Sequence, residues 1–244
     1  MPQIAKTIIP RIRNSIRNKG LLRTAWSCLL GPYYLVRNYR RVQRTFKDRA
    51  PDDFDVRYGV ETTKRVHLTD LQIESPNWVY AGGYWPTPPD VFREALAGLD
   101  ISFSDFTFID LGSGKGRVLL MASDYPFREI IGVEFSPELH AIAAENIRNY
   151  KNPQQACHSI RPLCMDFTLF EFPNTPLFVF LYNPSSESIT LKLAENLAHS
   201  LAENPRPAWV LYVTPTYDVF SSGKPLSLKS VKSGKHYTLY SNPY

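Results

Sequence analysis

Cysteine is scarce in this chain of 244 residues: Cys28, Cys157 and Cys164 are the only three, and no two stand at C-x-x-C spacing. A sparse, odd-numbered set argues against a disulfide framework and is typical of a reducing compartment, so we expect a cytoplasmic protein. The histidines are scattered along the chain. The sequence therefore indicates no metal site.

Acidic residues are nearly absent from the first 50 residues, which hold twelve Lys and Arg and a single acid. This segment carries a net charge of +11, and because the whole chain carries +5, residues 51–244 carry −6. Its apolar stretch at 21–36 is interrupted by Arg23 and by Gly31-Pro32, so it is too short and too broken to cross a bilayer. No small-residue cleavage site follows it, as a signal peptide requires, but its Arg-rich composition is also that of a transit peptide.

We predict that residues 1–50 form a basic helical extension, for which three roles are open. The first is packing of its apolar side on the main domain. The second is peripheral contact with an anionic membrane, and the third and least favoured is contact with nucleic acid. Residues 51–100 are expected to form a cap or lid segment that leads into the core domain, 101–244.

The core alternates short apolar runs with helical patterns. We expect strands at 106–110, 129–134, 159–166, 176–182 and 208–213. Between them, helices are expected at 117–125, 136–150 and 188–203, the second with Ser136 as its N-cap. Strands that alternate with helices form parallel sheets with right-handed crossovers, and the most apolar strand, 176–182, should be central.

Two alternating segments around Ser233-Gly234 predict a C-terminal hairpin. The fold class is therefore α/β: a doubly wound, Rossmann-like, mostly parallel sheet with a C-terminal antiparallel hairpin. Five αβ units are expected, with the ligand at the carboxyl ends of the strands.

The glycine-rich loop after the first expected strand lacks the spacing of the phosphate-binding loops. A dinucleotide loop reads G-x-G-x-x-G, whereas this one reads G-x-G-x-G from Gly112 to Gly116, with Arg117 in the place of the third dinucleotide glycine. No G-x-x-x-x-G-K-[ST] loop is present. These absences favour a ligand without phosphates and disfavour a dinucleotide oxidoreductase.

The run "DLGSGKG" at 110–116 resembles the first motif of class I S-adenosylmethionine-dependent methyltransferases, and the order of motifs over about residues 84–215 is similar to theirs. The resemblance implies S-adenosyl-L-methionine as cofactor. The amino-acid part of this cofactor would lie near Asp110, Gly112, Ser113 and Gly114. Glu134, followed by Phe135, would grip both ribose hydroxyls, since a carboxylate accepts from two donors. Asp166 would read the adenine amino group and Phe167 would cover the ring. The alternative is that Asp110 and Glu134 are only helix-capping or turn acids and that the glycines merely allow tight packing.

The run "LYNPSS" at 181–186 resembles the [DN]-P-P-[FY] signature of methyltransferases that act on nitrogen. Asn183 and Pro184 match, which would make Asn183 a catalytic residue close to the cofactor. Ser185 and Ser186 replace the second proline and the stacking aromatic, which removes the platform for a flipped base. A strand-ending turn is the alternative interpretation of Asn183-Pro184.

Upstream, "YAGGYWPTPPDVFREAL" at 80–96 resembles bacterial methyltransferases of unassigned substrate and, more distantly, protein-lysine methyltransferases of the DOT1 and mitochondrial ATP-synthase types. We expect Tyr84 and Thr87 to lie across the cofactor, with Tyr84 as a second catalytic candidate. The alternative is a hydrophobic staple that leads into a helix at Asp90.

The sequence thus predicts an N-directed methyltransferase, with protein lysine slightly favoured among unidentified acceptors. No residue identifies itself as a general base. A catalytically weak, cofactor-binding regulatory or scaffold module is the alternative from another class.

Overall fold

The computed structural model describes residues 52–67, 71, 83–182, 186–217, 219–221 and 226–242. The predictions for residues 1–50, for Asn183 and for Pro184 lie outside these residues.

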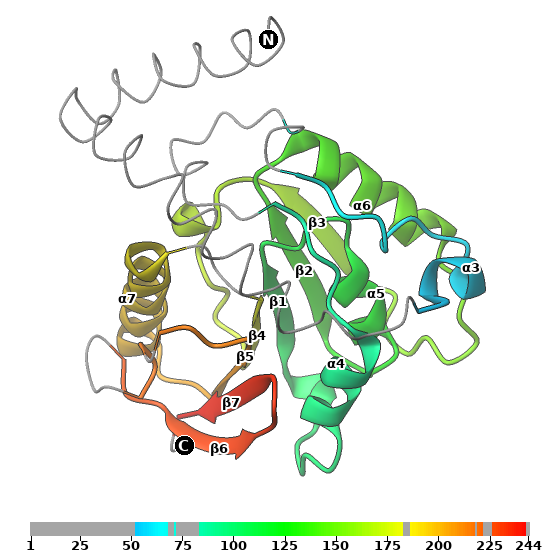
Figure 1. The fold of residues 1–244 in the computed structure, drawn as a ribbon. Coiled ribbons are helices and arrows are strands. Elements are labelled where there is room, and N and C mark those ends of the chain that lie inside the picture. Colours follow the sequence, from blue (N-terminus) through cyan, green and yellow to red (C-terminus); the bar gives the residue numbers. More distant parts are fainter. Residues whose placement is uncertain are drawn as a thin grey trace, which may run out of the picture.

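Seven strands of the described chain form one mixed sheet (Figure 1). Their bounds are β1 Thr107–Leu111, β2 Glu129–Glu134, β3 Ile160–Cys164, β4 Leu177–Tyr182, β5 Ala208–Val213, β6 Lys229–Ser233 and β7 Tyr237–Ser241. The order across the sheet is β3-β2-β1-β4-β5-β7-β6. The first five strands pair in parallel, and β7 runs antiparallel to both β5 and β6. The predicted sheet and hairpin are confirmed, and β4, the most apolar strand, stands in the middle.

Helices cover both faces of this sheet. Their bounds are α3 Phe54–Tyr58, α4 Pro89–Leu96, α5 Arg117–Ser123, α6 Pro137–Asn149 and α7 Glu187–Glu203, with short 3-10 helices η3 Phe103–Asp105 and η4 Phe167–Leu169. Local signals explain where the longer ones begin. The Ser136 hydroxyl accepts a hydrogen bond from the Leu139 amide of α6, and the Ser186 hydroxyl does the same for Ile189 of α7, each at 3.3 Å.

The two sides of the sheet hold two separate apolar clusters, because successive strand residues point to opposite faces. Phe108 and Phe180 pack with α4 and α5 on one face. Ile109 and Leu181 pack with α7 on the other. Of the described α-helices, Figure 1 shows α7 on one side of the sheet and α4, α5 and α6 on the opposite side.

One connection differs from the expected five αβ units. Between β3 and β4 the chain forms only the 3-10 helix η4, because Pro173 and Pro176 and a short span leave no room for a longer helix. Among the described residues, no helix is long and apolar enough to span a membrane.

Candidate functional site

The glycine loop folds over the carboxyl ends of β1 and β2, where a ligand of a doubly wound sheet is expected. The amides of Gly112 and Ser113 both donate to the Val133 carbonyl, at 2.8 and 3.0 Å. These bonds bring the loop after β1 against the last residue of β2, which is Glu134.

Both carboxylate oxygens of Glu134 accept backbone hydrogen bonds. The Gly114 amide donates to Oε2 and the Ser136 amide donates to Oε1, each at 2.8 Å. The side chain is 4% exposed, and this burial raises its pKa from 4.5 to about 7 against the opposing effect of the amide donors. Each oxygen keeps acceptor capacity, so the group can still receive two hydroxyl donors.

Asp110, at the end of β1, is the second buried acid here. It is 2% exposed, and burial first and the Glu134 charge second raise its pKa well above the usual range. No described residue donates a hydrogen bond to its carboxylate. Two neighbouring acids in a buried place favour a ligand that carries positive charge, because such a ligand stabilises both ionised forms.

The first two glycines of the loop have different neighbours. Gly112 has a φ of +93°, and a Cβ placed on it would meet no atom within 4 Å, so open space lies on that side. Gly114 has a φ of +54°, and a Cβ on it would stand 2.3 Å from the ring of Tyr84. Glycine is therefore required at 114 because the Tyr84 ring lies directly on the loop backbone.

Tyr84 is buried between this loop and the segment that precedes it. Its hydroxyl donates to the Thr62 carbonyl at 2.7 Å, and its ring belongs to a small apolar cluster with Leu71, Leu139 and Phe135. Burial raises the pKa of the hydroxyl above its usual value. Tyr84 thus reaches the loop through its ring, while the hydroxyl is directed to another part of the chain.

Two other predicted site residues, Thr87 and Ser113, are buried. Thr87 is buried, three residues after Tyr84. The buried hydroxyl of Ser113 points back towards the sheet, since a Cβ placed on Gly132 of β2 would stand 2.9 Å from it. Among the described residues this hydroxyl has no hydrogen-bond partner.

The end of β3 joins the same edge, because the Met165 amide donates to the Glu134 carbonyl at 2.9 Å. Asp166, the next residue, caps η4: one of its oxygens accepts from the amide and the hydroxyl of Thr168, at 2.9 and 2.8 Å. Phe167 packs against the apolar cluster on the α7 side. Asp166 thus caps a 3-10 helix, a role that the sequence interpretation did not assign to it.

Two cations of the glycine loop were missed by the sequence interpretation. Lys115 and Arg117 are each 1% exposed, and both pair with residues 52–63, which we call the strap. The signal that could have found them is the acid-rich run "DDFD" at 52–55, together with basic residues set into a buried apolar stretch.

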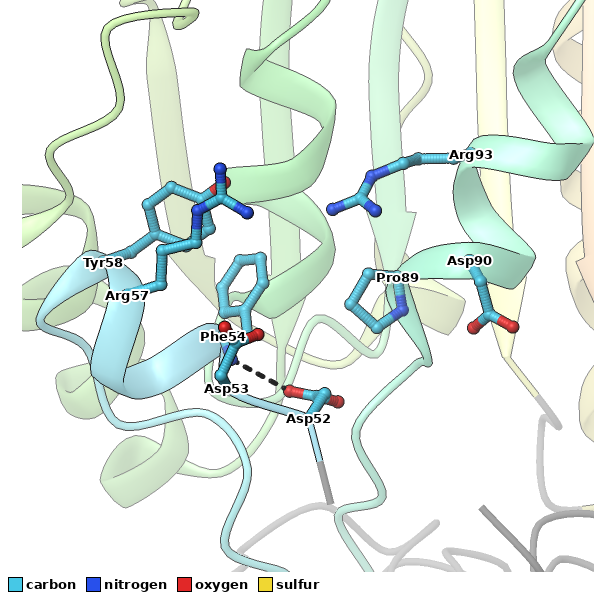
Figure 2. A pocket seen from close by; sticks show the side chains of 8 residues that line it. All are labelled: Asp52, Asp53, Phe54, Arg57, Tyr58, Pro89, Asp90 and Arg93. Atoms are coloured by element: carbon cyan, nitrogen blue, oxygen red, sulfur yellow. Dashed lines mark hydrogen bonds between the residues drawn. The ribbon is translucent and has the colours of Figure 1, made fainter. Parts of the chain in front are cut away.

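One cavity of about 280 Å³ lies between α3 and the first turn of α4 (Figure 2). Eight residues line it, none of them a predicted site residue: Asp52, Asp53, Phe54, Arg57, Tyr58, Pro89, Asp90 and Arg93. In the described part of the chain, no group of three or more His, Cys, Asp or Glu could hold a metal ion.

No protein-family model matches the sequence, and no curated protein does. Among solved structures, an RNA methyltransferase from Salinibacter ruber in complex with S-adenosyl-L-homocysteine is 19% identical, over 64% of this chain and 92% of that chain, with a TM-score of 0.43. A predicted N6-adenine-specific DNA methylase from Listeria monocytogenes is 16% identical, over 67% of this chain and 53% of that chain, with a TM-score of 0.48. A putative methyltransferase from Escherichia coli is 16% identical, over 64% of this chain and 86% of that chain, with a TM-score of 0.43.

All three likenesses are weak, with identities below 20% and TM-scores below 0.5, so they say nothing about what this chain does. The sheet itself has five parallel strands that are closed by an antiparallel hairpin, as the sequence predicted.

Proposed function

We propose that the protein is a methyltransferase that uses S-adenosyl-L-methionine. The observation that carries this proposal is the buried Glu134 carboxylate at the end of β2, held by the Gly114 amide of the glycine loop and still able to accept from a diol. An acid in this place, next to a loop without the dinucleotide spacing, suits a nucleoside that has no pyrophosphate.

The site residues fit this cofactor. Glu134 would accept from the two ribose hydroxyls, and the open side of Gly112 leaves room above the loop for the amino-acid part. Asp110 would lie close to the positive charge of the ligand. When bound, the cofactor supplies a methyl group already activated by its sulfonium. The chain must therefore orient the acceptor in line and exclude water.

Phosphate-bearing ligands fit poorly, for an electrostatic reason. Phosphate loops use a free cation, but here Lys115 Nζ lies 2.6 Å from Glu61 Oε1 and the Arg117 guanidinium contacts the Asp52 carboxylate. Both loop cations are thus buried and already neutralised by the strap.

We assign the acceptor atom to a nitrogen, on the strength of Asn183 and Pro184 directly after β4. The Asn183 side-chain oxygen would accept from the acceptor amine and direct its lone pair towards the methyl group. A protein lysine is the favoured acceptor, because the 80–96 segment and "DLGSGKGR" resemble protein-lysine methyltransferases. An ammonium acceptor must lose a proton before it attacks, and bulk water or a carboxylate can take that proton.

Calorimetry tests the cofactor assignment. Wild-type protein should bind S-adenosylmethionine and S-adenosylhomocysteine, while NAD and ATP should not reach a micromolar dissociation constant. Glu134→Ala should weaken cofactor binding by on the order of 2–4 kcal/mol, because two charge-assisted hydrogen bonds are lost. Arg161→Ala, which breaks an exposed ion pair with Glu129 at 3.0 Å, is the control and should bind normally. Normal affinity in Glu134→Ala would contradict the site.

Methyl transfer is tested with tritiated cofactor and fractionated cell extract. Label in protein that survives nuclease treatment would support a protein acceptor, as a lysine substrate requires, whereas label lost with nucleic acid would exclude it. Tight cofactor binding without transfer to any fraction would favour the regulatory or scaffold module.

A further inference from the structure

Lys115 and Arg117 present an unusual arrangement within a glycine loop. Lys115 stands between two of the loop glycines, and Arg117 is the first residue of α5. Each side chain is 1% exposed. A charge so deeply buried is strongly destabilising unless it is paired and hydrogen-bonded.

The partners of both cations lie on one short segment, the strap at 52–63. Lys115 Nζ pairs with Glu61 Oε1 at 2.6 Å. The Arg117 guanidinium contacts Asp52 and donates to Thr63 Oγ1 at 3.1 Å, and it lies 4.5 Å from the centre of the Phe54 ring. Figure 2 shows Asp52 and Phe54 together at the start of α3, where the Phe54 amide donates to Asp52. The loop therefore holds the strap at both of its ends.

The strap is rigid between those ends. One carboxylate oxygen of Asp55 accepts from the amides of Thr62 and Thr63, at 2.8 and 2.7 Å, and the other accepts from the Thr62 hydroxyl at 2.5 Å. Asn146 of α6 ties the strap to the loop. Its amide nitrogen donates to the carbonyls of Glu61 and Lys115, at 3.0 and 2.9 Å, and its oxygen accepts from the Glu61 amide at 2.8 Å. These bonds fix the direction of the Thr62 carbonyl.

That carbonyl determines where Tyr84 lies. It accepts the Tyr84 hydroxyl at 2.7 Å, while Val66, just beyond the strap, pairs with the Tyr84 backbone in an isolated antiparallel bridge. The ring then rests on Gly114, whose amide donates to Glu134. A closed path of contacts thus runs from the loop cations through the strap and Tyr84 back to the loop residue that orients Glu134.

We propose that Lys115 and Arg117 are positioning residues, which hold the strap so that the Tyr84 ring keeps Gly114 and Glu134 in the arrangement that receives the cofactor. This inference rests on the proposed cofactor site and adds residues that act through others. The pairs have a second consequence: the loop cations are used inside the fold and are not presented to the ligand.

The test measures the dissociation constant of S-adenosylhomocysteine well below the melting temperature, so that lost stability alone does not change the result. Tyr84→Phe keeps the ring and removes only the bond to the Thr62 carbonyl. Asp52→Ala and Glu61→Ala each remove the strap carboxylate that pairs with a loop cation. In both ion pairs the carboxylate is the more exposed member. Each of these variants should weaken binding by about 3- to 10-fold, the effect of one hydrogen bond. The double variant Tyr84→Phe/Asp52→Ala should bind S-adenosylhomocysteine no more weakly than the weaker-binding of the two single variants, because both changes interrupt the same path of contacts.

Tyr237→Phe is the matched control. Tyr237 is a buried residue of strand β7, and its hydroxyl also donates to a backbone carbonyl, that of Glu94 at 3.4 Å. It should leave the dissociation constant unchanged. Lower melting temperatures with wild-type affinity in Tyr84→Phe, Asp52→Ala and Glu61→Ala would overturn the positioning role and leave the proposed function intact. Failure of the wild-type protein to bind the cofactor would overturn both.

Discussion

At the scale of single residues, Glu134 is the group on which cofactor binding should depend most. It is buried beside a second acid, Asp110, and two backbone amides only partly offset the cost of its charge. The unliganded site therefore holds a carboxyl group that titrates close to neutral pH, and a ligand with hydroxyl donors and positive charge should favour its ionised form.

We predict that cofactor affinity rises as the pH rises through about 7, because only the ionised Glu134 can accept from both ribose hydroxyls. Below that pH the dissociation constant should increase by up to about tenfold per pH unit. Calorimetry over a pH series measures this directly. Glu134→Gln should bind weakly with little pH dependence in the same range, and a flat wild-type profile would argue against the assignment.

The stability of the unliganded protein should change in the opposite direction. Because the folded-state pKa lies above 4.5, Glu134 contributes stability that is fully present below about 4.5 and is lost as the pH rises through about 7. The difference corresponds to about 3 kcal/mol in the free energy of unfolding. Thermal melts of the wild-type protein and of Glu134→Gln across the same series should show a smaller loss in the variant.

At the scale of elements, the glycine loop combines two backbone positions with separate purposes. One side of Gly112 is open, and Gly114 is covered by Tyr84. Both have positive φ, so any side chain adds backbone strain. The difference between them lies in what a methyl group would meet.

Gly112→Ala and Gly114→Ala should therefore separate binding from stability. In Gly112→Ala the methyl group enters open space, so stability should fall by only about 1–2 kcal/mol while cofactor binding is strongly reduced. In Gly114→Ala the methyl group overlaps the Tyr84 ring, so the melting temperature should fall further, by about 2–4 °C for each additional kcal/mol. Differential scanning fluorimetry and calorimetry give the two quantities. Equal losses of stability would mean that the Tyr84 ring does not rest on Gly114.

At the scale of the whole molecule, charge is divided unevenly along the chain. Residues 1–50 carry +11 and residues 51–244 carry −6. Attraction between the two parts, and attraction of the basic part to an anionic partner, both follow from this division.

We predict that removal of residues 1–50 lowers the melting temperature of the remaining domain, as expected if this segment packs on it. Liposome flotation with anionic vesicles and a salt-titrated nucleic-acid shift, run on both forms, test the other two roles. Lipid binding should depend on apolar residues such as Trp26 and Leu29, whereas nucleic-acid binding should fall steeply with salt. Salt-sensitive nucleic-acid binding that disappears with the segment would prove the packing prediction wrong.

Local signals in the sequence were sufficient for most of the sheet. The apolar run 129–134 coincides with β2, and Ser136-Pro137 begins α6 as predicted. Such signals work because burial, capping and proline geometry act over a few neighbouring residues. The glycine spacing and the acid at the end of β2 likewise predict a ligand site at this edge of the sheet, and the binding experiments above test that prediction.

Tertiary structure decided the contacts between distant residues. Lys115 and Glu61 are 54 residues apart, and Tyr84 and the Thr62 carbonyl are 22 apart. Spacing along the chain cannot predict such pairs, because they form only after the strap folds back over the loop. The direction of the Ser113 hydroxyl towards β2 and the place of β7 between β5 and β6 are likewise contacts between segments that are distant along the chain. The sequence by itself determined the elements and the acid that should bind the cofactor, whereas long-range packing and the pairing of buried charge decided what covers the loop.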